Sequence, residues 1–434
     1  MPSIGIRIED KNEWERRVPL TPKHVRKITE QGIRVVVQPS AIRAFTDEEY
    51  KNAGSQVQED IWTGVDVIFG VKEMPVETLQ PSKTYMYFSH VIKGQRYNMP
   101  MLQHLLDSGS TLLDYEKIVD EKKRRLIFFG NYAGFAGMID SLWAYGQRLK
   151  WEGADTPLSN IKPAHGYPSL EEAKTAITAV GKELVASNLN SKGEPFVVGF
   201  LGYGNVSRGA QEILDCLPVE EVQPEALEAL FRAETDLSKV YKVVFYEKHL
   251  VRPKDPTRAF ALQDYYDHPQ SYESQFENYL PFLTIAMNAV YWQEIYPRFI
   301  TKAWVEERFR TGQARLKVIG DISCDIGGAV EVTLKCTGSG DPVFVYDVDK
   351  KDAVMGVEGN GPVVLAVDNL PCELPKESST FFGDRLEPFV SALANADYTV
   401  SFDELALPDE LKRAVIVYQG KLTPDYHYLE KFLT

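Results

Sequence analysis

The stretch Pro195-Phe-Val-Val-Gly-Phe-Leu201 runs directly into Gly202-Tyr-Gly-Asn-Val-Ser-Arg-Gly209, and this segment decides the fold. An apolar run that ends in a glycine-rich turn is typical of a buried strand followed by a helix. Gly202 would permit the tight turn, and Gly204 would let a pyrophosphate approach the backbone closely. The first N–H groups of the following helix would bind that anion. The segment therefore predicts a dinucleotide-binding turn.

The spacing of this turn departs from the usual fingerprint, because four residues rather than two separate Gly204 from Gly209. A strand–helix turn without a ligand is the alternative interpretation. In dinucleotide folds an acid about 20 residues after the first glycine binds the ribose 2′-OH. Glu220 and Glu221 lie at that distance, and a carboxylate there favours NAD over NADP by charge repulsion. Arg208 could instead bind a 2′-phosphate, so these residues leave the coenzyme open.

Strands and helices alternate on both sides of this segment, as the spacing of apolar residues indicates. In the first half we expect strands at 3–8, 33–37, 65–71, 84–89 and 111–114, with helices at 22–32, 47–54 and 100–109. In the second half we expect strands at 195–201, 240–246, 283–287, 316–322 and 343–346, with helices at 133–149, 170–184 and 210–217. This alternation predicts an α/β fold with two Rossmann-like, doubly wound parallel-sheet domains.

The 434 residues are enough for two to four domains of roughly 100–200 residues each. The helix at 133–149 is expected to cross between domains, and the segment 153–169 to be a connecting loop. Segment 219–282 is longer than a minimal crossover and is interpreted as an insertion. After Pro371-Cys-Glu-Leu-Pro375 the chain turns helical through 389–393.

Composition excludes several classes of function. The net charge of −14 argues against binding to nucleic acid or to anionic membranes. No uncharged stretch reaches the roughly 20 residues that span a bilayer, and the first residues do not form a signal peptide. Four cysteines without a CxxC pair indicate reduced thiols in a cytoplasmic protein, and seven scattered histidines indicate no metal site.

Polar residues follow the strands expected in the first half. Glu15 and Arg17 precede a helix, Lys72 and His90 each follow a strand, and Lys93 comes three residues after His90. Ligands of open parallel sheets bind beyond the carboxyl ends of the strands. Arg17 could bind a carboxylate there, while the pKa of a lysine among other cations is lowered toward neutrality. Each residue taken alone is more simply a surface charge, so the prediction rests on their joint placement.

A late loop adds an acidic candidate. Asp321 and Asp325 follow a strand, and the chain continues as Ile326-Gly-Gly328. A loop after a late strand of a dinucleotide fold can reach the nicotinamide. Asp321 could equally be a turn cap, whereas Asp325, beside the glycines, is the better candidate to face a ligand.

These motifs together resemble lysine–2-oxoglutarate reductase, the saccharopine-forming half of the bifunctional aminoadipic semialdehyde synthases. More distantly, the chain is similar to fungal lysine-forming saccharopine dehydrogenase and to alanine dehydrogenase. The resemblance spans nearly the whole chain. The matching strings are Trp14-Glu-Arg-Arg-Val-Pro-Leu-Thr-Pro22, Phe88-Ser-His90, Asp114-Tyr-Glu116, Ala133-Gly-Phe-Ala-Gly-Met138, Gly204-Asn-Val-Ser-Arg-Gly-Ala-Gln211, Asn288-Ala-Val-Tyr-Trp292, Asp321-Ile-Ser-Cys-Asp-Ile-Gly-Gly328 and Asp368-Asn-Leu-Pro371.

The resemblance implies two Rossmann-like domains with an interdomain cleft. The catalytic domain would be discontinuous, comprising 1–132 plus 372–434, and the dinucleotide-binding domain would comprise 133–371 with its insertion around 219–282. The implied reaction condenses L-lysine with 2-oxoglutarate and reduces the imine to saccharopine, the first step of lysine degradation.

The resemblance also implies a set of site residues. It places the catalytic pair at Lys72 and His90, and substrate binding at Arg17, Glu15, Lys93 and Asp325. The residues expected to hold the cofactor are Gly202, Tyr203, Gly204, Asn205, Val206, Glu221, Asn288 and Asp325. NADP(H) is favoured by the resemblance, and NAD(H) is the alternative that Glu221 suggests.

The similar bifunctional enzymes continue into a glutamate-forming saccharopine dehydrogenase domain, so fusion to or cooperation with such a domain is expected. A processed or excised eukaryotic domain would lie in the mitochondrial matrix rather than the cytoplasm. Two other functions stay open on the sequence: an NAD-dependent amino-acid dehydrogenase similar to alanine dehydrogenase, and a nucleotide-binding regulator without catalysis. The long segment 219–282 disfavours a transhydrogenase subunit.

Overall fold

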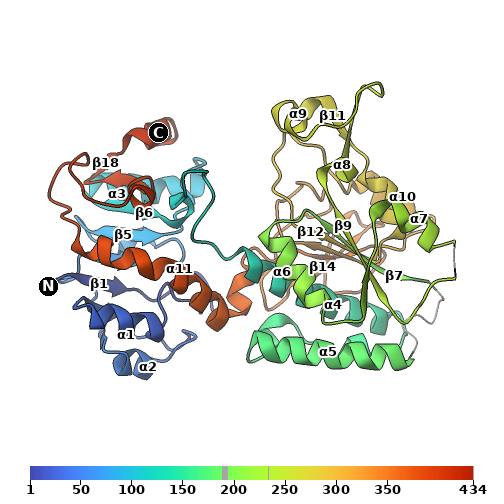
Figure 1. Ribbon diagram of the computed structural model, residues 1–434, viewed down its shortest axis with the longest axis horizontal. Helices are drawn as coiled ribbons and strands as arrows, with labels where there is room; N and C mark the ends of the chain where they lie inside the picture. Colours follow the sequence, from blue (N-terminus) through green and yellow to red (C-terminus); the bar gives the residue numbers. More distant parts are fainter. Residues whose placement is uncertain (188–193, 233, 434) are drawn as a thin grey trace. The chain divides into compact units, whose positions relative to one another are not determined.

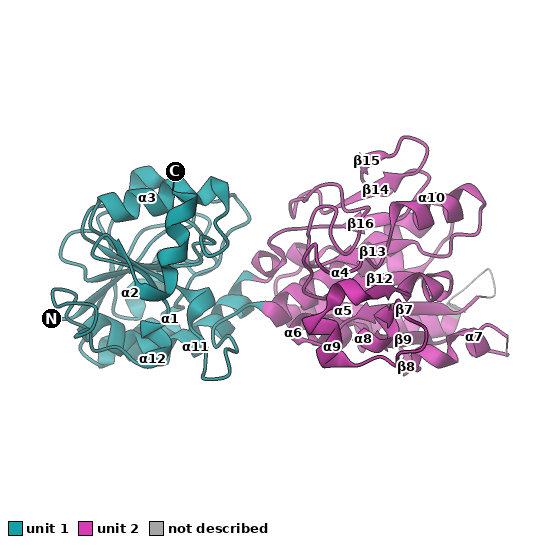
Figure 2. Cartoon of the chain, turned by 90° about the horizontal axis from the view of Figure 1, so that it is seen from above, with its two compact units in different colours: residues 1–129, 375–434 teal, residues 130–374 magenta. Residues whose placement is uncertain are grey.

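The computed structural model describes residues 1–187, 194–232 and 234–433 (Figure 1). The chain forms two compact units, the first from Met1–Phe129 with Pro375–Thr434 and the second from Gly130–Leu374 (Figure 2). It enters the second unit at the start of helix α4 (Gly130–Trp151) and returns at the start of helix α11 (Pro375–Asn395). These boundaries lie three residues from the expected ones at 132/133 and 371/372.

The first unit is built on one eight-stranded sheet in the order β18-β17-β6-β5-β4-β1-β2-β3. The strands are β1 (Ser3–Ile6), β2 (Arg34–Val37), β3 (Gln56–Val57), β4 (Val67–Phe69), β5 (Thr84–Tyr87), β6 (Thr111–Asp114), β17 (Val415–Tyr418) and β18 (Lys421–Leu422). Strands β1 to β6 are parallel, whereas β17 runs antiparallel to β6 and β18 antiparallel to β17. The carboxyl ends of β1, β4, β5 and β6 therefore meet at one edge.

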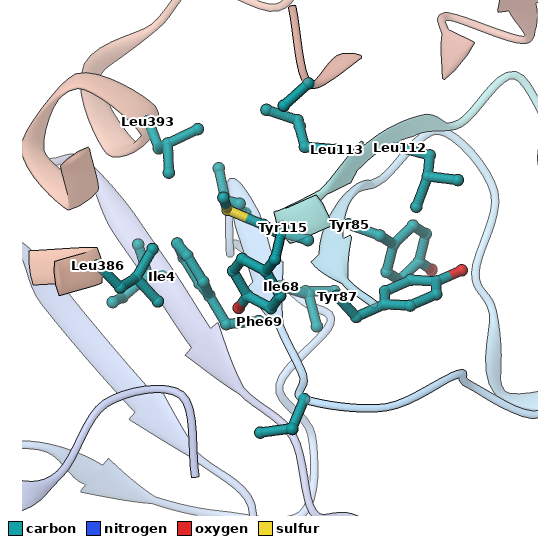
Figure 3. Packing of buried hydrophobic residues seen from close by; sticks show 14 of the residues in the cluster. Ile4, Ile68, Phe69, Tyr85, Tyr87, Leu112, Leu113, Tyr115, Leu386 and Leu393 are labelled. Carbon is teal, nitrogen blue, oxygen red and sulfur yellow. The ribbon is translucent and has the colours of Figure 1, made fainter. Parts of the chain in front are cut away.

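Helices of the first unit are α1 (Pro22–Glu30), α2 (Asp47–Asn52), α3 (Met99–Asp107), α11 and α12 (Asp409–Lys412). Helix α11, which belongs to the C-terminal segment, lies against α1 near the N-terminus of the chain (Figure 1). Lys23 pairs with Asp384 at 2.9 Å and Lys27 with Glu387 at 3.0 Å across these two helices. Figure 3 shows Leu386 of α11 in the same apolar core as Ile4 and Phe69 of the sheet. The C-terminal segment thus completes this core.

The second unit is built on another eight-stranded sheet, in the order β15-β14-β16-β13-β12-β7-β9-β8. The strands are β7 (Phe196–Leu201), β8 (Val219–Glu221), β9 (Val240–Phe245), β12 (Ile285–Asn288), β13 (Val318–Asp321), β14 (Val343–Asp347), β15 (Asp352–Met355) and β16 (Val363–Leu365). Strand β7 lies between β9 and β12, and both neighbours are parallel to it. Among the described strands of this sheet only β14 is reversed, because it pairs antiparallel with both β16 and β15 near one edge.

Both faces of this second sheet are covered. The helices are α4, α5 (Leu170–Ser187), α6 (Asn205–Leu214), α7 (Leu227–Leu230), α8 (Glu247–Leu250), α9 (Leu262–Asp267) and α10 (Lys302–Arg310). Val198 and Phe200 of β7 pack in one apolar cluster with residues of α4, α5 and α6. Val197 and Leu201 pack in another cluster with residues of α10. Alternate residues of one strand thus serve two layers, which is the doubly wound arrangement expected.

Segment 219–282 is not wholly an insertion, because β8 and β9 within it belong to the main sheet. The remainder carries α8, α9 and a separate antiparallel pair, β10 (Val251–Pro253) with β11 (Tyr272–Ser274). Helix α6 begins at Asn205, five residues before the expected start of the helix at 210–217. Strand β14 is the strand expected at 343–346, whereas β15, β16, β17 and β18 extend the sheets beyond the expected set.

Among the described residues, no helix is both long and apolar enough to span a membrane. Within the same residues no group of three or more histidine, cysteine or acidic side chains is placed to hold a metal ion. Cys216, Cys324 and Cys336 are free thiols, and the Sγ atoms of Cys324 and Cys336 lie 3.2 Å apart.

Candidate active site

Side chains at the edge where β1, β4, β5 and β6 end are joined by hydrogen bonds. The Glu9 carboxylate, beyond β1, accepts the backbone N–H of Val71 at 2.7 Å and of Lys72 at 3.0 Å, both beyond β4. Beyond β5, the Ser89 N–H donates to Asp114 at 2.9 Å, and the Ser89 hydroxyl donates to the same carboxylate oxygen. These bonds hold the loop that carries Lys72 to the segment beyond β1, and the loop that carries His90 to the end of β6.

His90 is held in place by a carboxylate and by its own backbone. Its Nδ1 lies 2.5 Å from Glu73 Oε1, and its ring stacks on Phe88 with centroids 6.2 Å apart. The φ angle of His90 is +51°, a left-handed conformation that costs free energy and clusters at functional sites. Burial acts to raise the pKa of Glu73, but the hydrogen bond and charge of His90 outweigh it and lower that pKa to about 2. Glu73 is therefore a carboxylate throughout the physiological range.

Lys72 lies among other cations, as the sequence predicted. Burial is the main cause that lowers the pKa of its ammonium group, and the charges of Arg17 and Lys11 lower it further. Glu15 and Glu73 oppose that shift. The structure thus brings Lys72, Arg17 and Glu15 together and links Lys72 to His90 through the adjacent Glu73. A lysine in this setting releases its proton more readily than one at the surface.

Arg17 is a buried guanidinium that already has an acidic partner. Its Nε and Nη2 donate to the two oxygens of Glu15 at 2.8 and 2.6 Å. Its guanidinium also lies over the Phe129 ring, 4.3 Å from the centroid. This bidentate pair holds the guanidinium in a fixed orientation, and a substrate carboxylate would compete with Glu15 for it.

Glu9 is a further residue of this site, which was not predicted from the sequence. It is 6% exposed, and burial raises its pKa to about 7 although the nearby Arg7 opposes the shift. The signal that could have found it is the one that selected Lys72 and His90, since Glu9 follows the first strand of the same parallel set. Lys93 has an exposed side chain in the loop beyond His90.

In the second unit the glycine turn has the shape that a dinucleotide requires. Gly202 has a φ of +92°, and a Cβ there would meet Val290 at 3.0 Å. A Cβ on Gly204 would meet nothing within 4 Å, so the backbone is open to a ligand at that point. Asn205 and Val206 form the first turn of α6, whose N–H groups bind anions. The residues present therefore fit a bound pyrophosphate.

The departure of the third glycine from the usual spacing has a packing reason. A Cβ on Gly209 would lie 2.2 Å from the backbone oxygen of Asn131, and one on Gly134 would lie 2.0 Å from that of Val206. Helices α4 and α6 therefore approach each other backbone to backbone. Gly209 is required for the contact between the two helices, so its place in the sequence is set by α4 and not by the glycine turn.

Glu221 lies away from this turn. It ends the edge strand β8, where it pairs with Lys242 at 3.1 Å. A cavity of about 440 Å³ beside the turn is lined instead by Glu247, together with Gly202, Tyr203, Gly204, Leu250, Tyr265, Tyr266, Ala289, Val290, Tyr291, Trp292, Tyr296 and Phe299. The acid next to the glycine turn is thus Glu247, which was not among the residues predicted from the sequence.

Of the remaining predicted residues, Asn288 and Asp321 end β12 and β13, and Asp325 lies in the loop beyond β13. The Asn288 amide donates to Asp321 at 2.8 Å and to Ser323 at 2.9 Å, and Thr333 donates to the other Asp321 oxygen at 2.6 Å. Burial raises the pKa of Asp321 against these hydrogen bonds. Asp321 is therefore the centre of a buried network that shapes the loop, whereas Asp325 in that loop is exposed.

Two parallel-sheet units, one carrying titratable groups at its strand ends and the other a glycine turn, define the class of pyridine-nucleotide dehydrogenases. The description "Alanine dehydrogenase/PNT, N-terminal domain" matches residues 5–136, and "Alanine dehydrogenase/PNT, C-terminal domain" matches residues 294–425. The chain belongs to this alanine dehydrogenase/PNT family.

Curated relatives of the chain fall into two groups. Alpha-aminoadipic semialdehyde synthase of Bos taurus is 38% identical over 99% of this chain and 47% of the relative. The synthase of Arabidopsis thaliana is 37% identical over 99% of this chain and 41% of its own. The chain therefore spans about half the length of these relatives. Saccharopine dehydrogenase [NAD(+), L-lysine-forming] of Yarrowia lipolytica is 26% identical over 91% of this chain and 93% of its own.

Among solved structures, an L-alanine dehydrogenase superposes with a TM-score of 0.63 at 19% identity and covers 100% of both chains. A transhydrogenase from Sinorhizobium meliloti superposes with a TM-score of 0.58 at 14% identity. These likenesses show that the two-unit fold is shared.

Proposed function

We propose that this chain catalyses the reductive condensation of L-lysine with 2-oxoglutarate to saccharopine, using a reduced nicotinamide dinucleotide. The observation that carries the proposal is the set Lys72, Glu73, His90 and Arg17 at the strand ends of the first unit, in a chain whose relatives include saccharopine dehydrogenases. The semialdehyde synthases, which match over 99% of the chain, support the same reaction class.

Imine formation needs an uncharged amine, because an ammonium group has no lone pair. Lys72 Nζ, with its lowered pKa, would accept the proton that the ε-ammonium of the lysine substrate must lose. Attack on the ketone gives a carbinolamine, whose hydroxyl must then leave as water. A protonated His90 Nε2 would supply that proton, since Glu73 holds the opposite ring nitrogen.

The substrates carry three carboxylates in total, one on lysine and two on 2-oxoglutarate. Arg17 is the candidate to bind one carboxylate of the keto acid, because its planar guanidinium matches that group. Glu15 would keep this guanidinium oriented before the substrate arrives. The exposed Lys93 is the second cationic candidate on the same unit.

When bound, the coenzyme supplies the hydride that reduces the imine. The chain contributes the glycine turn and the first turn of α6, which would bind its pyrophosphate. Asp325 is proposed to act at the nicotinamide end, from the loop beyond β13. The product saccharopine would be consumed by a glutamate-forming dehydrogenase, either fused to this chain or separate from it.

A steady-state assay across substrate pairs tests the reaction. We expect NADH or NADPH oxidation with L-lysine plus 2-oxoglutarate, and saccharopine as the product by mass spectrometry. Oxidation with ammonium plus pyruvate instead would identify an amino-acid dehydrogenase of the alanine dehydrogenase kind. Nucleotide binding without turnover of any pair would identify a regulator.

A further inference from the structure

Strand β8 follows β7 along the chain, but it is not a neighbour of β7 in the sheet. Strand β8 comes first, but it lies at the sheet edge, and β9 occupies the place beside β7. Leu201 of β7 pairs with Phe245 of β9, and the Gly202 N–H donates to the Phe245 carbonyl at 3.1 Å. In doubly wound folds the acid that binds the adenosine ribose ends this neighbouring strand. That position belongs to Glu247, two residues beyond Phe245.

Two tyrosine hydroxyls orient the Glu247 carboxylate. Tyr266 donates to Glu247 Oε1 at 2.7 Å, and Tyr203 of the glycine turn donates to the same oxygen at 3.3 Å. Tyr203 also stacks on Tyr246 with ring centroids 4.8 Å apart. Burial and the adjacent carboxylate raise the pKa of both Tyr203 and Tyr266, so these phenols remain donors. Glu247 is thus held as an acceptor directly beside the turn.

The cavity that contains Glu247 has the chemistry of an adenosine site. Its walls are mostly aromatic and aliphatic, including Tyr265, Trp292 and Phe299, and flat rings suit a purine base. Among its described lining residues Glu247 is the only charged one, and neither lysine nor arginine is present. A ribose 2′-OH could donate to Glu247, whereas a 2′-phosphate would meet a carboxylate with no lining cation to offset the repulsion.

We infer that Glu247 makes this chain bind NAD(H) in preference to NADP(H). This inference rests on the proposed function for its premise that the second unit holds a nicotinamide dinucleotide. It runs against the NADPH preference that the family resemblance implied. It also moves the selecting role from Glu221, which chain distance indicated, to an acid that only the sheet order reveals.

Isothermal titration of the full chain with NADH and with NADPH, without substrates, tests the inference. We expect the wild type to bind NADH at least about 10-fold more tightly than NADPH, because like charges oppose the phosphate. Glu247→Gln keeps the shape and removes the charge, so it should strengthen NADPH binding and weaken NADH binding. Glu247→Asp keeps the charge and should retain the preference, which separates charge from general disturbance of the cavity.

Glu221→Gln is the matched comparison, because it removes the competing acid from the edge strand. We expect it to leave the NADH-to-NADPH ratio of dissociation constants within about 2-fold of the wild type, since Glu221 does not line the cavity. Tighter binding of NADPH by the wild type would overturn the inference. A ratio that moves with Glu221→Gln and not with Glu247→Gln would overturn it as well.

The outcome is separable from that of the proposed function. A preference for NADH in the titration, with no turnover of lysine plus 2-oxoglutarate, would reject the reaction and keep the role of Glu247. Turnover of that pair with NADPH preferred would reject the role of Glu247 and keep the reaction. Binding of neither dinucleotide would reject both.

Discussion

Lys72 is a residue of the proposed mechanism whose surroundings change its acid–base chemistry. Burial and the adjacent cations lower its pKa, which gives it a base function that a surface lysine lacks. We expect Lys72→Met to reduce kcat by about 10²-fold, the usual scale of a lost acid–base group. Lys23→Met on α1 is the control, since Lys23 is exposed and pairs only across the surface with Asp384. Wild-type turnover in Lys72→Met, with intact folding by circular dichroism, would contradict the assignment.

Substitution of His90 should also reduce turnover, and single-turnover kinetics can test which step is slowed. His90→Gln removes the imidazole that Glu73 orients, and we expect a loss in kcat of about 10²-fold. Single-turnover measurement with a preformed mixture of lysine and keto acid should show that the chemical step, and not coenzyme release, has slowed. An unchanged single-turnover rate would show that another group protonates the carbinolamine.

Arg17 should act on binding more than on turnover. Because its guanidinium is buried and already oriented by Glu15, Arg17→Ala removes a prepared carboxylate site. We expect the KM for 2-oxoglutarate to rise by about 10- to 100-fold, the effect of losing one charge-assisted contact. Arg26→Ala, on the exposed side of α1, is the matched control. An unchanged KM for the keto acid would assign the carboxylate to another residue.

At the scale of elements, the contact of α4 with α6 supports the glycine turn. A Cβ on Gly209 would lie 2.2 Å from the Asn131 oxygen, which is backbone and cannot move aside cheaply. We expect Gly209→Ala to lower the free energy of unfolding by about 1–3 kcal/mol, as overpacking does. Gly338→Ala is the control, since a Cβ there meets nothing within 4 Å. Equal chemical-denaturation midpoints for the two variants would show that the helices separate easily.

The buried acids Asp140 of α4 and Glu373 tie the first helix of the second unit to the segment before α11. Burial and the adjacent Glu373 raise the pKa of Asp140, and burial raises that of Glu373 to about 7. Since the ordinary glutamate value is 4.5, the folded state binds protons more tightly than the unfolded state. The stability that the Glu373 proton supplies is therefore full below pH 4.5 and is lost as pH rises through about 7.

Replacement of Glu373 by its amide should remove the part of this pH dependence that comes from Glu373. Glu373→Gln can donate to Asp140 Oδ2, which has no hydrogen-bond partner among the described residues. We expect the variant to be more stable than the wild type by about 1–3 kcal/mol at pH 8, because position 373 no longer carries a buried carboxyl that ionises. The difference should shrink toward pH 5. Urea unfolding at both pH values is the measurement, and a difference independent of pH would refute the explanation.

Prediction from the sequence is weakest for short strands whose position depends on the order of strands in the sheet. Strand β7 and the helices around it were found because their apolar periods are long and regular. Strand β8 is three residues long, and its place at the edge depends on β9, so distance along the chain selected Glu221 where sheet order selects Glu247. Lys72 and His90 could be found because each directly follows a strand. Glu9 follows one as well, but its role depends on the Val71 and Lys72 amides, which no local pattern reveals.

At the scale of the whole molecule, the two units differ in whether they are formed by one continuous stretch of the chain. The second unit is continuous, from Gly130 to Leu374, whereas the first needs both ends of the chain. Strand β17 covers the edge of β6, and Phe382 of α11 stacks on Phe129 with ring centroids 4.5 Å apart. Residues 1–129 alone would expose that edge and a large part of the core.

This difference predicts how fragments behave. We expect residues 130–374 to fold alone and to bind NADH, because every strand partner of β7 lies within them. Residues 1–129 alone should aggregate, whereas residues 1–129 joined to 375–434 by a short Gly/Ser linker should be soluble and cooperative in thermal unfolding. A short linker suffices because Phe129, the last residue of the first fragment, contacts Phe382 near the start of the second fragment. A soluble, cooperatively folded 1–129 fragment would show that the C-terminal segment is an addition to this core, and the return of the chain would then need a functional explanation.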